Sequence, residues 1–106
     1  MTPRHRPSHA AHERLQLLLE EIEARTPRAE AARRVRVSAP HARSAYLSYM
    51  RLAGPRDDVL DYAAELLADD RRRPGSERAP LELVAIEAET DEELTLLFSK
   101  SLYEGE

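Results

Sequence analysis

The side chains available for a hydrophobic core limit what this chain can fold into. The 106 residues include one phenylalanine and four tyrosines, but no tryptophan and no cysteine. The core must therefore be built largely from leucine, alanine and valine, and a chain this short buries only about 65% of the surface that its unfolded form exposes. We expect one small soluble domain of modest stability, which association between copies would increase.

Apolar residues recur at helical spacing in four segments of the chain. The predicted helices span about 9–25, 41–53, 56–70 and 91–103. Gly54 and Pro55 lie between the second and the third helix, which predicts a hairpin of two helices at that point. Thr90 and Glu93 form a T-x-x-E capping box, which marks the start of the fourth helix.

Two segments are predicted to be short strands, at about 33–38 and 82–89. The first alternates polar and β-branched residues, with Val35 and Val37 directed inward. The second fits a strand or a helix by periodicity, and we favour a strand because a helix begins at Thr90. Isolated strands are unstable, so the two pair with each other or with strands of another copy. The predicted fold class is a helix-rich α+β domain.

The organisation is predicted to be simple. Residues 1–7 hold two prolines and no apolar anchor, so we expect a flexible tail before a single domain spanning 8–106. Residues 71–80, RRRPGSERAP, are predicted to be a mobile loop. No segment has the continuous hydrophobicity of a signal peptide or a membrane span, which favours a cytoplasmic protein. The chain has 15 arginines and one lysine, a ratio that is typical of a GC-rich coding sequence and favours a bacterial protein.

Charge is distributed unevenly along the sequence. Residues 1–56 contain 11 arginines and five acidic residues, a net charge of +6, whereas residues 57–106 carry a net charge of −10. The segment 33–56 contains six arginines and no acidic residue. Guanidinium groups bind phosphate oxygens, so this segment is a candidate for contact with nucleic acid. The candidate residues are Arg34, Arg36, Arg43 and Arg51.

A second interpretation of the same arginines is that they pair with the acidic half of the chain, or with that of a neighbouring copy. Tyr46 and Tyr49 lie on the apolar stripe of the predicted helix at 41–53, so we expect them in the core and not stacked on bases. The triple arginine at 71–73 lies between acidic neighbours. Those neighbours partly cancel its field within a Debye length of about 8 Å, which makes it a weaker candidate.

The order of strand, proline, helix, glycine turn and helix over residues 33–70 is partly similar to a ribbon-helix-helix DNA-binding unit. The similarity would place Arg34, Arg36 and Ser38 in the major groove, on paired strands of a dimer. The chain departs from this pattern because Asp57 and Asp58 begin the predicted helix at 56–70, which corresponds to the second helix of that unit, where the unit approaches phosphate. The similarity therefore does not identify a family.

Catalytic and metal-binding patterns are sparse. His5, His9 and His12 recur at i, i+4 and i+7, but a solvated helix start explains them better than a metal site, and we expect no cofactor. Three glycines do not make a phosphate-binding loop, and the carboxylates at 57, 61 and 65 fit a solvated helix face better than an acid–base pair. We therefore expect that this protein is not an enzyme.

The sequence therefore predicts a non-catalytic binding or regulatory protein that acts as a homo-oligomer through a charge-segregated surface, basic in the N-terminal half and acidic in the C-terminal half. The alternative is a nucleic-acid-binding regulator that uses the arginines of segment 33–56, while its acidic C-terminal part binds a protein partner.

Overall fold

The structure is a computed structural model that describes residues 9–40 and 47–101. In chain order, its elements are α1 (His9–Glu23), the 3-10 helix η1 (Ala29–Arg34), β1 (Arg36–Ser38), β2 (Leu47–Pro55), α2 (Arg56–Arg72), β3 (Leu81–Glu89) and β4 (Glu93–Ser101). The mixed α+β class that the sequence predicts is confirmed. The number of strands is wrong, because the described residues form four strands instead of two.

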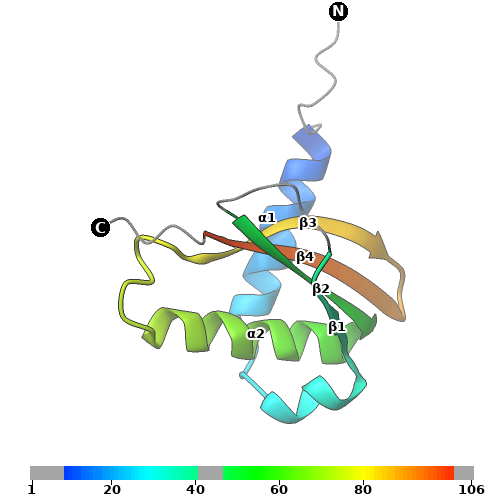
Figure 1. Cartoon of the computed structure of the whole chain (residues 1–106). Helices are drawn as coiled ribbons and strands as arrows, with labels where there is room; N and C mark the ends of the chain where they lie inside the picture. The colour runs from blue at the N-terminus through cyan, green and yellow to red at the C-terminus, as the bar shows by residue number, and fades with distance from the viewer. Residues whose placement is uncertain (1–8, 41–46, 102–106) are drawn as a thin grey trace, which may run out of the picture.

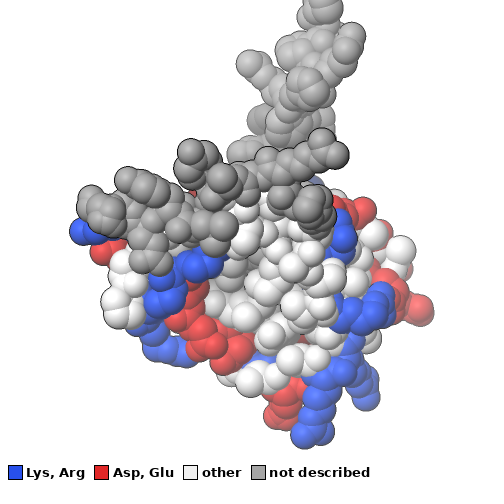
Figure 2. Space-filling model, viewed as in Figure 1, with Lys and Arg blue, Asp and Glu red and all other residues white. Residues whose placement is uncertain are grey.

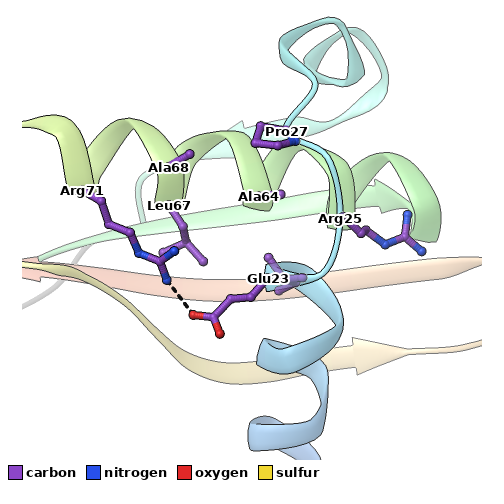
Figure 3. Close-up of a pocket in the computed structure, with 8 residues that line it drawn as sticks. Glu23, Arg25, Pro27, Ala64, Leu67, Ala68 and Arg71 are labelled. Carbon is purple, nitrogen blue, oxygen red and sulfur yellow. Dashed lines mark hydrogen bonds and ion pairs between the residues drawn. The ribbon is translucent and has the colours of Figure 1, made fainter.

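The four strands form one antiparallel sheet in the order β1-β2-β4-β3 (Figure 1). Both α-helices pack on one face of this sheet, α1 next to β3 and α2 over β2 and β4 (Figures 1 and 3). The molecule thus has two layers, and the opposite face of the sheet, called here the far face, has neither α-helix on it. β1 and β3 are the two edge strands.

The core lies between the helices and the sheet. The helices contribute fully buried apolar residues such as Leu18, Ile22 and Leu60, and the central strands contribute Leu52 and Phe98. The full set of buried core residues is Leu18, Ile22, Val35, Leu52, Val59, Leu60, Ala63, Ala64, Leu67, Leu94, Leu96 and Phe98. As the composition requires, one phenylalanine is surrounded by aliphatic side chains.

The predicted helix at 41–53 is wrong where the structure describes it, because residues 47–55 form β2. Residues 41–46 lie outside the described residues. In β2, Met50 and Leu52 follow the two-residue period of a strand and pack against the helices, next to Phe98 and Leu96 of β4. The same stretch also fits a helical stripe through Tyr49, so the local pattern did not distinguish the two structures.

The predicted helix at 91–103 is also wrong, because residues 93–101 form β4; residues 102–106 lie outside the described residues. Leu94, Leu96 and Phe98 alternate along the strand and are fully buried. The capping interaction expected of Thr90 is present in a different setting. Its Oγ1 accepts hydrogen bonds from the backbone N–H groups of Glu92, at 3.2 Å, and Glu93, at 2.9 Å, within the β3–β4 turn.

The remaining elements match the sequence more closely. The helices predicted at 9–25 and 56–70 are confirmed as α1 and α2, and the strand predicted at 82–89 is confirmed as β3. The strand predicted at 33–38 is shorter, because η1 continues to Arg34. Gly54 belongs to β2 and does not join two helices; a Cβ atom there would lie 2.6 Å from the carbonyl oxygen of Arg34, so glycine allows η1 to approach the sheet.

The segment predicted to be a mobile loop contains the end of α2 and a turn. Arg73 donates hydrogen bonds to the carboxylate of Asp70 and to the carbonyl oxygen of Ala79, both at 3.0 Å, and Ala79 is buried. These contacts give the turn a defined path. Its mobility stays a prediction, and the predicted tail at 1–7 lies outside the described residues.

Substitution of neighbouring β4 residues should distinguish the two faces of the sheet. Phe98 is fully buried, whereas Leu97 is half-buried on the far face. We expect Phe98→Ala to lower the free energy of unfolding by about 3–5 kcal/mol and Leu97→Ala by about 1–2 kcal/mol, because only the first leaves a cavity in the core. Urea denaturation followed by circular dichroism measures both, and equal losses would contradict the assignment of faces.

Candidate binding surfaces

The four arginines proposed for nucleic-acid contact do not form one cluster in the described residues. Arg36 lies on β1 opposite Ala53, and Ser38 lies opposite Arg51 of β2. Directly opposed residues share a face of the sheet. Arg51 and Ala53 flank the buried Leu52, so they lie on the face away from the helices, and Arg36 lies there with them. Arg34 lies apart from them at the end of η1, with its side chain 76% exposed. Arg43 lies outside the described residues.

Several arginines of the segment 33–56 pair with acidic residues from elsewhere in the chain. Arg51 Nε donates to Glu87 at 2.5 Å, and this ion pair crosses β4 on the far face. Arg34 lies 3.9 Å from Asp58 in a looser pair. Arg33 and Arg36, in contrast, make no ion pair with another described residue. Much of the positive charge of the segment 33–56, which the sequence suggested for contact with a polyanion, is therefore paired with carboxylates of the same chain.

A corner of the molecule is held by Glu89, at the end of β3. Its carboxylate accepts hydrogen bonds from Arg14 of α1 and from Arg56 at the start of α2, the latter at 2.8 Å. Arg56 also pairs with Glu21 of α1 at 3.4 Å. The bonds from Arg14, and then from Arg56, outweigh desolvation and lower the pKa of Glu89 to about 2. This cluster joins three elements that are far apart in the sequence.

Asp61 contradicts the expectation of a solvated helix face, since it is only 8% exposed. Its two carboxylate oxygens accept hydrogen bonds from Arg25 at 3.0 Å and from Arg28 at 3.2 Å. Arg25 also donates to Asp57 at 3.1 Å. These arginines belong to the connection between α1 and η1. Asp61 thus fixes that connection against α2, which is a structural role.

Asp70 forms a similar cluster at the other end of α2. Its carboxylate accepts hydrogen bonds from the backbone N–H of Leu81 at 2.9 Å and from Arg73, and it lies 3.5 Å from Nζ of Lys100. Desolvation raises the pKa of Asp70, but these partners outweigh it and hold the pKa below its usual value. The triple arginine is likewise paired, since Arg71 contacts Glu23 at 2.6 Å and Arg72 contacts Asp69.

The hollows of the described surface are modest. One of about 140 Å³ lies between α1 and α2, and the Glu23–Arg71 ion pair crosses it (Figure 3). A neighbouring hollow of about 360 Å³ continues toward Leu81 and Leu83 of β3. A third, of about 260 Å³, is lined mainly by charged residues next to η1. The described linings do not bring together a nucleophile, a base and an oxyanion donor.

Uncharged side chains gather over the middle of the sheet, in the area around β2, and charged side chains lie around them (Figure 2). On the far face, Tyr49 lies opposite Ser99, and Arg51 lies opposite Leu97. Tyr49 is half-buried on a strand, so its predicted place on the apolar stripe of a helix is wrong. Tyr46 lies outside the described residues.

The described residues hold no group of three histidine, cysteine, aspartate or glutamate side chains that could bind a metal ion. His12 is exposed on α1, and His5 lies outside the described residues. Neither α1 nor α2 is both long enough and apolar enough to span a membrane. Comparison with known proteins gives no match to a family model, to a curated protein or to a solved structure.

The sequence did not identify the acidic residues that bind the arginines of other elements at these surfaces. Glu89 and Asp61 are separated from the arginines that bind them by tens of residues, so no short motif contains a pair. The feature of the sequence that indicated these ion pairs was the opposite net charge of its two halves. It indicated pairing in general but not the partners.

Removal of the Glu89 carboxylate should change how stability depends on pH. A carboxylate whose pKa is lowered in the folded state stabilises that state above its unfolded pKa of about 4.5, and the contribution is lost as the pH falls toward 2. We expect Glu89→Gln to cost about 1–2 kcal/mol at pH 7, allowing for screening by solvent, and less than half of that at pH 3.

Urea denaturation at both pH values measures this effect. Glu92→Gln is the matched control, because the Glu92 side chain lies in the adjacent turn without an ion pair to a described residue. An equal loss for Glu89→Gln at pH 7 and pH 3 would show that the Arg14 and Arg56 contacts do not hold the carboxylate ionised.

Proposed function

We propose that this chain is a non-catalytic binding protein that acts as a homo-oligomer, with its copies attracted to one another by surfaces of opposite charge. The observation that carries the proposal is the position of the charges that remain unpaired among the described residues. On the side formed by η1 and β1, the unpaired Arg33 and Arg36 outweigh the unpaired Glu30, which leaves a net positive charge. On the side formed by α1 and β3, the described charges without an ion pair are acidic: Glu13, Glu20 and Glu82.

The pairing of the other charges supports this proposal. A chain with a net charge of −4 binds a polyanion through a continuous strip of uncompensated positive charge. Arg51, Arg56 and Arg34 each have a carboxylate partner, which interrupts such a strip. Two unpaired arginines are enough to orient a second copy that carries an acidic surface, because complementary fields act on association before contact.

A second candidate function is a nucleic-acid-binding regulator, which the far face favours. Arg36, Tyr49 and Arg51 share this face, and Tyr49 lies on a central strand. A tyrosine on an open antiparallel sheet, next to arginines, has the chemistry for stacking on an unpaired base. In this function the acidic C-terminal part would bind a protein partner.

Light scattering across a range of protein concentration tests the proposed function. We expect the average mass to rise between about 5 and 500 μM in 50 mM salt and to fall toward the monomer in 500 mM salt, because screening shortens the reach of exposed charges. A chain that stays monomeric over the whole range would contradict the proposal.

The same samples with mixed-sequence DNA and RNA test the second candidate. Binding that weakens steeply with salt in the unmodified protein, and is lost in the variant Arg36→Ala, would favour the nucleic-acid function. Undetectable binding in 50 mM salt would exclude it.

A further inference from the structure

The two edges of the sheet have no neighbouring strand among the described residues. β1 pairs only with β2, and β3 pairs only with β4. An edge strand offers a row of backbone N–H and C=O groups to an added strand. Sheet edges are therefore where copies of this chain can extend one another.

Exposed apolar residues coincide with both edges. Three large hydrophobic residues are markedly exposed among the described ones, and two of them are Val37 of β1, at 50%, and Val84 of β3, at 40%. Val84 lies at an irregularity in the pairing of β3 with β4, between Leu83 and Ala85. A β-branched side chain on an edge strand packs well against a neighbouring strand and gains little in water.

The charges determine which edges pair. Among the described residues, β1 carries the unpaired Arg36, and the unpaired Arg33 lies on the adjoining η1. β3 carries the unpaired Glu82 and no basic residue, while its other glutamates, Glu87 and Glu89, pair with arginines of the same copy. Contact between two β1 edges would bring arginines together, and contact between two β3 edges would bring glutamates together. Like charges on opposed strands are destabilising, and opposite charges are stabilising. Contact between unlike edges is therefore favoured.

From these three observations we propose that β1 of one copy adds to β3 of the next, so that copies associate head to tail into a continuous sheet. The proposal rests on the homo-oligomer proposed above and identifies its interface. Because the two contacting surfaces differ, the arrangement is open-ended unless its rotation closes a ring.

The dimensions of the edges make this association weak and reversible. β1 has only three residues, so the shared ladder is short and the contact falls at the small end of protein interfaces. The irregularities in β3 and the charges on both edges are features that prevent uncontrolled pairing of sheet edges. Association of this kind responds to protein concentration and to salt.

Charge reversal at each edge, in the full chain, tests the proposal. Sedimentation in 50 mM salt compares the unmodified protein with Arg36→Glu, with Glu82→Arg, and with the variant that combines both. We expect each single reversal to weaken association by about tenfold or more, and the double reversal to restore most of it, because opposite charges again face each other. Glu77→Arg, in the exposed turn after α2, is the matched control and should leave association unchanged.

A second set of variants tests the apolar contact without changing charge. Val37→Ser and Val84→Ser should each weaken association about tenfold, because each removes part of the apolar area buried at the contact. Their circular dichroism spectra should match that of the unmodified protein because neither side chain lies in the core. Small-angle scattering should show particles that lengthen as the protein concentration rises.

The outcomes distinguish this inference from the function on which it rests. A stable dimer of fixed mass that is insensitive to both charge reversals and both valine substitutions would overturn the edge contact and leave the homo-oligomer in place. Failure of the double reversal to restore association would also overturn it. A monomer at every concentration would overturn both proposals.

Discussion

The fold depends on β4, which occupies an interior position of the sheet and pairs with β2 along its whole length and with β3 on its other side. Its residues Leu94, Leu96 and Phe98 are fully buried against the helices, so one strand supplies both the central ladder and much of the core. β4 is also the last described element. β3 and β4 form a local hairpin, but the sheet is not completed until β4 joins β2, which precedes it by tens of residues, and this pairing makes the topology non-local.

This dependence on distant pairing explains which parts of the fold the sequence could predict. α1, α2 and β3 follow from local patterns, and so does the α+β class. The segments that became β2 and β4 contain apolar residues whose spacing fits both a helix and a strand; Leu94 and Phe98, for example, are i and i+4 on a helix and share one face of a strand. Only the neighbouring strands decide between these structures, and a single sequence does not show them.

Thr90 illustrates the same limit at the level of one hydrogen bond. The T-x-x-E pattern correctly indicated that its hydroxyl would accept the backbone N–H three residues on, at Glu93. Such bonds stabilise helix starts and tight turns alike, since both leave N–H groups without a partner. The charged contacts show the limit over longer distances. The two halves of the sequence do carry opposite charge, but much of that charge forms internal ion pairs such as Arg51–Glu87, and among the described residues only a few unpaired charges are left on each side of the molecule.

This internal pairing changes how the arginine content should be interpreted. Exposed ion pairs contribute little to stability individually, about 0–1 kcal/mol, but each one removes a guanidinium from the set available to a partner. In a chain with 15 arginines, the ones most available to a partner are therefore the few that form no ion pair within the described residues. Arg33 and Arg36 belong to this group. Arg36 lies on the short edge strand β1 and Arg33 lies on the adjoining η1, and the exposed Val37 of β1 adds apolar surface. Unpaired charge and an exposed valine thus coincide at this edge, as they do at the β3 edge with Glu82 and Val84, and the two edges differ in the sign of that charge.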